Sequence, residues 1–98
     1  MEVRIQAIHF DASEQLQAFI NKKAAKLERF FDNIKSVEVS LKVVKPESSC
    51  NKEVGIRVLV PNEEFYATKV SDTFEQSVDE SLDALAKQLV KYKEKLRM

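Results

Sequence analysis

Apolar and polar residues alternate in the segment Lys35-Ser-Val-Glu-Val-Ser-Leu-Lys-Val-Val44. In a β-strand, successive side chains point to opposite faces of the sheet. The alternation therefore predicts a strand over 35–44 that is buried on one face only. The residues expected on its buried face are the apolar ones, Val37, Val39, Leu41 and Val43.

Two later segments, 53–60 and 64–70, show a similar pattern and predict two further strands. They are joined by Pro61-Asn62, and both residue types favour tight turns. Residues 45–52 contain proline, serine and asparagine, which predicts a turn or loop after the first of the three strands. Because the connections are short, the three strands should run antiparallel.

The chain before these strands predicts a strand followed by a helix. Residues 2–8 alternate in the same way, and Ser13 is a suitable N-cap for a helix that ends near Asp32. The apolar residues that recur at helical spacing are Leu16, Phe19, Ile20, Leu27, Phe30 and Phe31.

A second helix is predicted after the last strand. Asp72 and Glu75 have the spacing of a capping box, in which the two side chains satisfy the first free N–H groups of a helix. An apolar stripe then runs over about six turns. Its members are Phe74, Val78, Leu82, Leu85, Leu89, Tyr92 and Leu96.

The predicted order of elements is therefore β-α-β-β-β-α. The helix between the first two strands makes a crossover, so those strands should be parallel and the connection right-handed. We expect an α+β fold with a four-stranded mixed sheet, two helices packed on one face and the other face open. The length of 98 residues fits a single domain, 1–98.

Composition limits the classes of function. Sixteen Lys and Arg balance sixteen Asp and Glu, so binding to a polyanion would need a local basic patch. Residues 1–10 lack the apolar block of a signal peptide, and no segment approaches the roughly 20 apolar residues of a membrane span. The single cysteine, Cys50, excludes an internal disulfide. We expect a cytoplasmic protein with no membrane partner.

Signals for catalysis, cofactors and metals are weak. The only glycine, Gly55, falls within a predicted strand, which excludes a glycine-rich phosphate loop. His9 and Cys50 are too few for a zinc site or a Cys–His pair. Asp79 and Asp83 lie one turn apart, but acidic residues are also favoured near a helix N-terminus. We therefore expect no enzymatic activity, no metal and no cofactor.

Basic residues gather instead on the two helices. In the second helix, Lys87, Lys91 and Lys95 are spaced four apart along one flank of the apolar stripe. Like charges at this spacing repel by a few tenths of a kcal/mol per pair, which folding alone does not require. A polyanion such as RNA could make this arrangement useful. The opposite flank carries Lys93 and Arg97.

The first helix adds Lys22, Lys26 and Arg29 on one side of its apolar stripe. Lys23 falls almost on the stripe, so its side chain must reach an edge of the helix or the helix must rotate. Helix dipoles and pairs such as Asp83–Lys87 and Glu94–Lys91 could also explain these charges. These residues alone leave RNA binding and a solvated surface equally open.

Three segments resemble the short ribosome hibernation-promoting factors, relatives of the ribosome-associated inhibitor. They are Ala25-Lys-Leu-Glu-Arg-Phe-Phe-Asp-Asn-Ile34, Val37-Glu-Val-Ser-Leu-Lys-Val43 and Asp83-Ala-Leu-Ala-Lys-Gln-Leu-Val-Lys-Tyr-Lys-Glu-Lys95. The resemblance runs from about residue 3 to the C-terminus. It implies a fold similar to double-stranded RNA-binding domains.

The resemblance also implies binding to the small ribosomal subunit and its RNA, in the channel for messenger and transfer RNA, which blocks translation when growth slows. The basic positions that it marks are Lys23, Lys26, Lys87, Lys91, Lys93 and Lys95. Lys22 and Arg29 are added by the helical wheel alone. The rival interpretations are a protein-interaction module that uses the open sheet face or an edge strand, and a general binder of double-stranded RNA.

This sequence departs from the family pattern in three places. Ala84 stands where a basic residue is usual, and Glu75 and Glu80 make the start of the second helix more acidic than expected. The sequence ends at Met98, without the C-terminal domain with which long members pair ribosomes. Pairing is therefore expected to need a second factor or not to occur.

Overall fold

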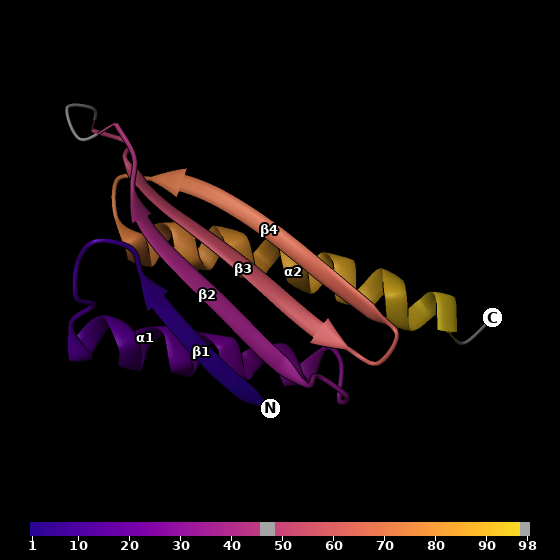
Figure 1. The fold of residues 1–98 in the computed structure, drawn as a ribbon. Coiled ribbons are helices and arrows are strands. Elements are labelled where there is room, and N and C mark those ends of the chain that lie inside the picture. Colours follow the sequence, from indigo (N-terminus) through magenta and orange to yellow (C-terminus); the bar gives the residue numbers. More distant parts are fainter. Residues whose placement is uncertain (46–48, 97–98) are drawn as a thin grey trace.

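The computed structural model describes residues 1–45 and 49–96 and has the predicted β-α-β-β-β-α order (Figure 1). One mixed sheet is formed by strands in the order β1-β2-β3-β4, with β1 parallel to β2 and the other pairs antiparallel. The strands are β1 (Glu2–Ala7), β2 (Ser36–Val43), β3 (Lys52–Val60) and β4 (Glu63–Ser71).

Both helices lie on the same face of this sheet, and the opposite face is uncovered (Figure 1). They are α1 (Glu14–Ala25), which continues as the 3-10 helix η1 (Lys26–Arg29), and α2 (Phe74–Leu96). Helix α2 packs on β3 and β4, whereas α1 contacts β1 and α2. The predicted α+β fold class is confirmed.

The core lies between the sheet and the two helices because the alternating strands turn their apolar residues to one side. Val39 of β2 pairs with Ile5 of β1 and Ile56 of β3, which places three apolar side chains in one cross-strand row. The largest fully buried side chains are Ile20, Leu27, Leu41, Ile56, Leu85 and Leu89. Within the described ranges, no helix combines the length and apolar character that a membrane crossing requires.

The two helix starts agree only in part with the sequence. Ser13 caps α1 as predicted, because its hydroxyl oxygen accepts a hydrogen bond from a backbone N–H three residues later. The capping box predicted at Asp72 is wrong. Thr73 accepts the hydrogen bond from the backbone N–H of Gln76, at 3.1 Å. Asp72 instead accepts a hydrogen bond from the thiol of Cys50, at 2.9 Å.

The end of the first helix also differs from the prediction. The α-helix stops at Ala25, and η1 follows it in place of a regular helix to Asp32. The backbone N–H groups of Phe30 and Phe31 both donate to the carbonyl of Leu27, at 2.9 and 3.2 Å. Phe31 is buried but Phe30 is 38% exposed, so the prediction that both rings face the core is wrong for Phe30.

Two other apolar side chains predicted to be buried are exposed. Val43 ends β2 and is 38% exposed, and Leu96 in the last turn of α2 is 60% exposed. The buried face of α2 includes Ser77 and Ser81, whose hydroxyls donate to backbone carbonyls of β3. The predicted loop over 45–52 falls partly on 46–48, which lie outside the described residues.

Candidate nucleic-acid interface

Three adjoining concavities lie between the end of the first helical segment and α2, and Phe30 lines all three. Ala86 and Val90 provide the apolar wall on α2, and Val90 is 39% exposed. We call the three concavities together the interhelical groove. Their volumes are about 450, 220 and 230 Å³.

Six of the eight predicted RNA-binding residues line this groove. Lys23 and Lys26 border one concavity, Lys87 and Lys91 the second, and Arg29 and Lys93 the third. The structure therefore brings together charges that are about sixty residues apart in the sequence. Acidic residues also border the groove, namely Asp79, Asp83 and Glu94.

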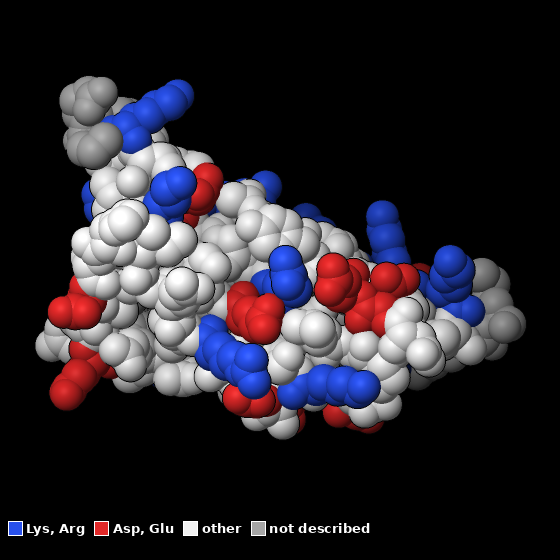
Figure 2. Space-filling model, in the orientation of Figure 1, with Lys and Arg blue, Asp and Glu red and all other residues white. Residues whose placement is uncertain are grey.

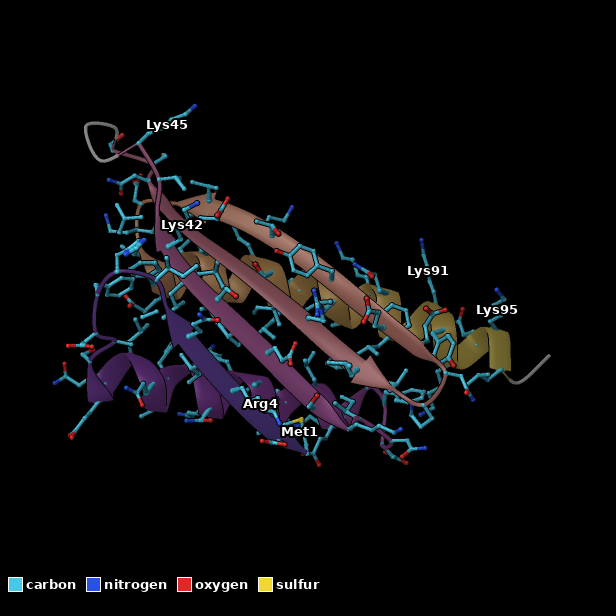
Figure 3. All side chains as sticks on the ribbon, in the orientation of Figure 1. Met1, Arg4, Lys42, Lys45, Lys91 and Lys95 are labelled. Carbon is cyan, nitrogen blue, oxygen red and sulfur yellow. The ribbon has the colours of Figure 1, made fainter. Side chains whose placement is uncertain are left out.

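The other two predicted residues, Lys22 on α1 and Lys95 on α2, are exposed but do not line the groove. In Figure 3 the side chain of Lys95 extends away from the body on the side of β4, as does that of Lys91. The basic stripe of α2 therefore spreads from the groove toward the β4 edge. Arg97, which the sequence placed on the opposite flank, lies outside the described residues.

Lys23 differs from the other basic residues of the groove because its charge is already engaged. Its Nζ lies 3.4 Å from a carboxylate oxygen of Asp79 on α2, and 5.4 Å from the centroid of the Phe19 ring. The side chain is 28% exposed, so it reaches the edge of α1 that faces α2. It joins the two helices and is the least available of the six for an external anion.

The remaining groove cations are not paired in this way. Ion pairs within 4.0 Å, among residues 1–45 and 49–96, involve only Arg4, Arg57 and Lys23 as cations. The pairs Asp83–Lys87 and Glu94–Lys91, considered from the sequence as a structural explanation of the basic stripe, do not form at this distance. Five groove cations are thus available to an anionic ligand.

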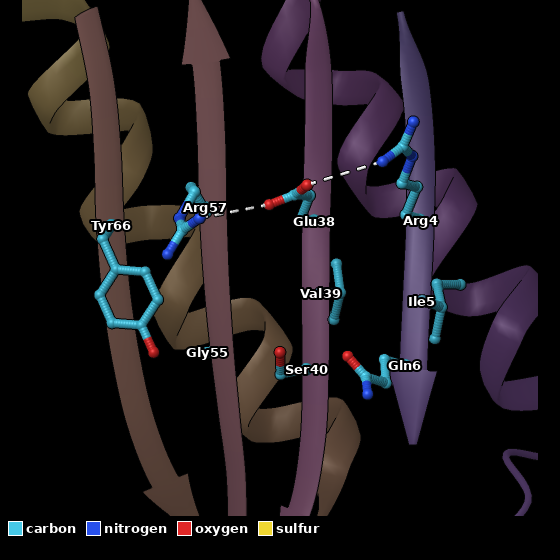
Figure 4. Close-up of a pocket in the computed structure, with 9 residues that line it drawn as sticks. All are labelled: Arg4, Ile5, Gln6, Glu38, Val39, Ser40, Gly55, Arg57 and Tyr66. Atoms are coloured by element: carbon cyan, nitrogen blue, oxygen red, sulfur yellow. Dashed lines mark ion pairs between the residues drawn. The ribbon is translucent and has the colours of Figure 1, made fainter. Parts of the chain in front are cut away.

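The open face of the sheet has a different character. Arg4, Glu38, Arg57 and Tyr66 are cross-strand neighbours and form one row over all four strands (Figure 4). Glu38 lies between the two arginines, 3.6 Å from Arg57 and 4.0 Å from Arg4. Figure 2 shows basic and acidic side chains interspersed over this side of the molecule. The row itself carries two arginines and one glutamate, and Arg4 also pairs with Glu2, so two carboxylates offset the two arginines and leave little net attraction for a polyanion.

The row borders a concavity of about 430 Å³ on the open face. Gly55 has a packing role here, because a Cβ atom at this position would lie 2.5 Å from the hydroxyl oxygen of Tyr66. At the end of the row, Arg4 donates a hydrogen bond of 2.9 Å to Glu2, and this hydrogen bond lowers the pKa of the Glu2 carboxyl. The row could not be predicted from sequence because it depends on strand register.

The structure indicates no chemistry of its own at Cys50. The hydrogen bond to the carboxylate of Asp72 raises the pKa of the thiol, which keeps the thiol protonated and less reactive. In the described part of the chain, no three His, Cys, Asp or Glu residues are grouped so that they could hold a metal ion.

Sequence reasoning missed Phe30 and Val90 as parts of the candidate interface. Both are apolar, and Phe30 was assigned to the buried stripe. The sequence carried no clear signal for this exposure, because adjacent residues of a helix can both be buried, as Ser81 and Leu82 are in α2.

The fold and the groove define a class of small α+β protein in which two helices cover one face of a mixed sheet and carry basic residues between them. The chain belongs to the Sigma 54 modulation protein / S30EA ribosomal protein family, whose sequence model matches residues 3–97. This confirms the resemblance inferred from the sequence.

Individual relatives match over nearly the whole chain. The ribosome hibernation promoting factor of Escherichia coli strain K12 is 32% identical over 97 residues, which cover 99% of this chain and 98% of that protein. A ribosomal subunit interface protein from Coxiella burnetii has a TM-score of 0.81 at 27% identity, covering 95% of this chain and 98% of that one. The N-terminal domain of Thermus thermophilus Protein Y shares the fold, with a TM-score of 0.82 at 17% identity, covering 94% and 99%.

Proposed function

We propose that this protein is a ribosome hibernation factor that binds the small ribosomal subunit in the channel for messenger and transfer RNA, and so blocks translation in slow growth. The observation that carries the proposal is the interhelical groove, which is lined by six basic residues from α1, η1 and α2, five of which have no carboxylate within 4.0 Å among the described residues. The near full-length similarity to a hibernation promoting factor supports the same function. The site of action is the cytoplasm, where ribosomes work.

The proposed mechanism is steric. Lysine and arginine contacts to phosphates fix the position of a protein on RNA without reading its sequence, so specificity comes from the shape of the ribosomal channel. The bound body, with extents of 48 × 23 × 19 Å, occupies space that messenger and transfer RNA need. No catalytic step is required. Pairing of ribosomes, as expected from the sequence, then either needs a second factor or does not occur.

The test is sedimentation of the protein with purified small subunits, with large subunits and with duplex RNA of about 20 base pairs. The proposal predicts co-migration with small subunits and much weaker association with the other two. Equal binding to all three would favour a general binder of double-stranded RNA.

The alternative function is protein interaction through the open sheet face, and the row that ends in Tyr66 favours it. Tyr66 is 57% exposed, and tyrosine and arginine are common in protein interfaces. The substitution Tyr66→Leu separates the two functions. It should leave small-subunit binding unchanged if RNA binds in the groove, and weaken it if the protein docks through the sheet.

A further inference from the structure

Phe30 is the one aromatic ring that the interhelical groove exposes among its lining residues. It borders all three concavities and is 38% exposed. Cationic residues from both helical segments line the same concavities, and they are Lys26, Arg29, Lys87, Lys91 and Lys93. An exposed aromatic ring surrounded by cations is the arrangement that binds unpaired nucleotides, where bases stack on the ring and phosphates contact the cations.

The adjacent phenylalanine, Phe31, packs into the protein interior and so contrasts with Phe30. The ring of Phe31 lies 5.6 Å from that of Tyr92, and Tyr92 lies 5.3 Å from Phe65. These three rings join the segment after η1 to α2 and β4. Phe30 instead leaves more than a third of its surface in the groove, so much of the ring is free to contact a ligand.

We propose that Phe30 is a stacking platform for an unpaired base of ribosomal RNA, and that the flanking cations hold the phosphates on either side of that base. This inference rests on the proposed function and specifies its ligand. A regular duplex cannot use the platform because its base faces are already stacked. The RNA in the groove is therefore a single-stranded segment or a base turned out of its helix.

The acidic lining residues fit this ligand better than a second row of phosphates. Asp83 and Lys26 border one of the concavities, and Glu94 borders the other two. A carboxylate can accept hydrogen bonds from the amino groups of bases but repels phosphate. The base is therefore placed on Phe30, within reach of these carboxylates, and the phosphates contact the cations.

Stacking and charge contacts respond differently to salt, which makes the proposal testable. Removing a phosphate contact flattens the dependence of affinity on salt, by slightly less than one unit of slope for each contact. Removing a stacking ring lowers affinity at every salt concentration and leaves the slope unchanged. The informative variant is Phe30→Leu, which keeps an apolar side chain and removes the ring, with Phe30→Tyr as the variant that restores stacking.

The experiment measures binding of the full chain to purified small subunits at several salt concentrations, with the thermal unfolding midpoint as the check on folding. Phe30→Leu should weaken binding about 5- to 150-fold at each salt concentration with the slope retained. Phe30→Tyr should bind about as tightly as the unchanged protein. Tyr66→Leu removes an exposed ring from the opposite face of the sheet, and should have no effect.

Equal binding by Phe30→Leu and the unchanged protein would overturn the stacking proposal while the proposed function stands. A flatter salt slope in Phe30→Leu would also overturn it, because the substitution would then have displaced charge contacts. Failure of the unchanged protein to bind small subunits would contradict the proposed function itself. A single-stranded oligonucleotide would then serve as the probe: weaker binding by Phe30→Leu would support stacking, and equal binding would overturn it.

Discussion

Reversing two charges on the basic stripe of α2 should weaken ribosome binding without unfolding the protein. The variant combines Lys87→Glu and Lys91→Glu, which replace two exposed groove cations that have no carboxylate within 4.0 Å among the described residues. Because both side chains lie away from the core, the substitutions should change the free energy of unfolding only slightly. Two attractions to phosphate become two repulsions.

The magnitude follows from the contacts in the groove. Five available cations, each contributing about 0.7 to 0.9 to the slope, give log affinity against log salt a slope of about −3.5 to −4.5. The unchanged protein should then lose about 100- to 500-fold in affinity between roughly 50 and 200 mM salt. With three cations left, the slope falls to about −2.1 to −2.7, and the loss over the same range falls to about 20- to 40-fold.

The cost in stability should be small by comparison. A glutamate at position 87 would repel Asp83 one turn earlier, and the two new glutamates would repel each other, at a few tenths of a kcal/mol for each pair. The glutamate at position 91 would gain an attraction to Lys95 of similar size. Since 1 kcal/mol shifts the unfolding midpoint of a domain this small by about 4–8 °C, the net change should be a few degrees at most.

The assay is co-sedimentation with small subunits over a salt series, and the structure supplies a matched control. Lys42→Glu with Lys45→Glu makes the same change in net charge at the other end of the molecule (Figure 3). The control pair should keep the slope of the unchanged protein. An equal effect of the two double variants would mean that net charge and not the groove drives binding, and would refute the reasoning.

Three further predictions test the placement of side chains. Ala84→Lys adds a cation beside Lys87 and should steepen the salt slope by about 0.7 to 0.9, measured by the same co-sedimentation; an unchanged slope would show that this flank does not face RNA. Leu85→Ala empties a fully buried position and should lower the free energy of unfolding by about 2–5 kcal/mol in urea denaturation. Cys50 should react with iodoacetamide at mildly alkaline pH more slowly than free cysteine, because its raised pKa leaves less thiolate there, and Asp72→Asn should speed the reaction.

Much of the fold could be predicted because its strands are buried on one face. The alternation of apolar and polar residues predicted the ends of all four strands to within one or two residues. The helical connection between β1 and β2 predicted that these two strands are parallel. The errors in the predicted elements occur at helix ends, where neighbouring residues could each serve as the cap. Helix α2 begins at Phe74, one residue later than a cap at Asp72 requires, so Thr73 is the cap, and Asp72 accepts a hydrogen bond from Cys50, a partner that sequence spacing does not reveal.

The candidate site was predicted less completely. Helical spacing located the basic residues, but it treated the first helix as regular to Asp32. The change to a 3-10 helix at Lys26 alters the direction of each later side chain, which is why the exposure of Phe30 was missed. Spacing also could not show that Lys23 pairs with Asp79, because the two residues lie on different helices.

Competition for the decoding channel tests the central claim most directly. Small subunits carrying a messenger RNA with a transfer RNA bound to it would be mixed with the labelled protein, and its affinity compared with that for empty subunits. The account predicts mutual exclusion: bound transfer RNA should prevent the protein from binding, and excess protein should block transfer RNA from binding to empty subunits. Equal affinity for empty and occupied subunits would place the binding site elsewhere and contradict the account.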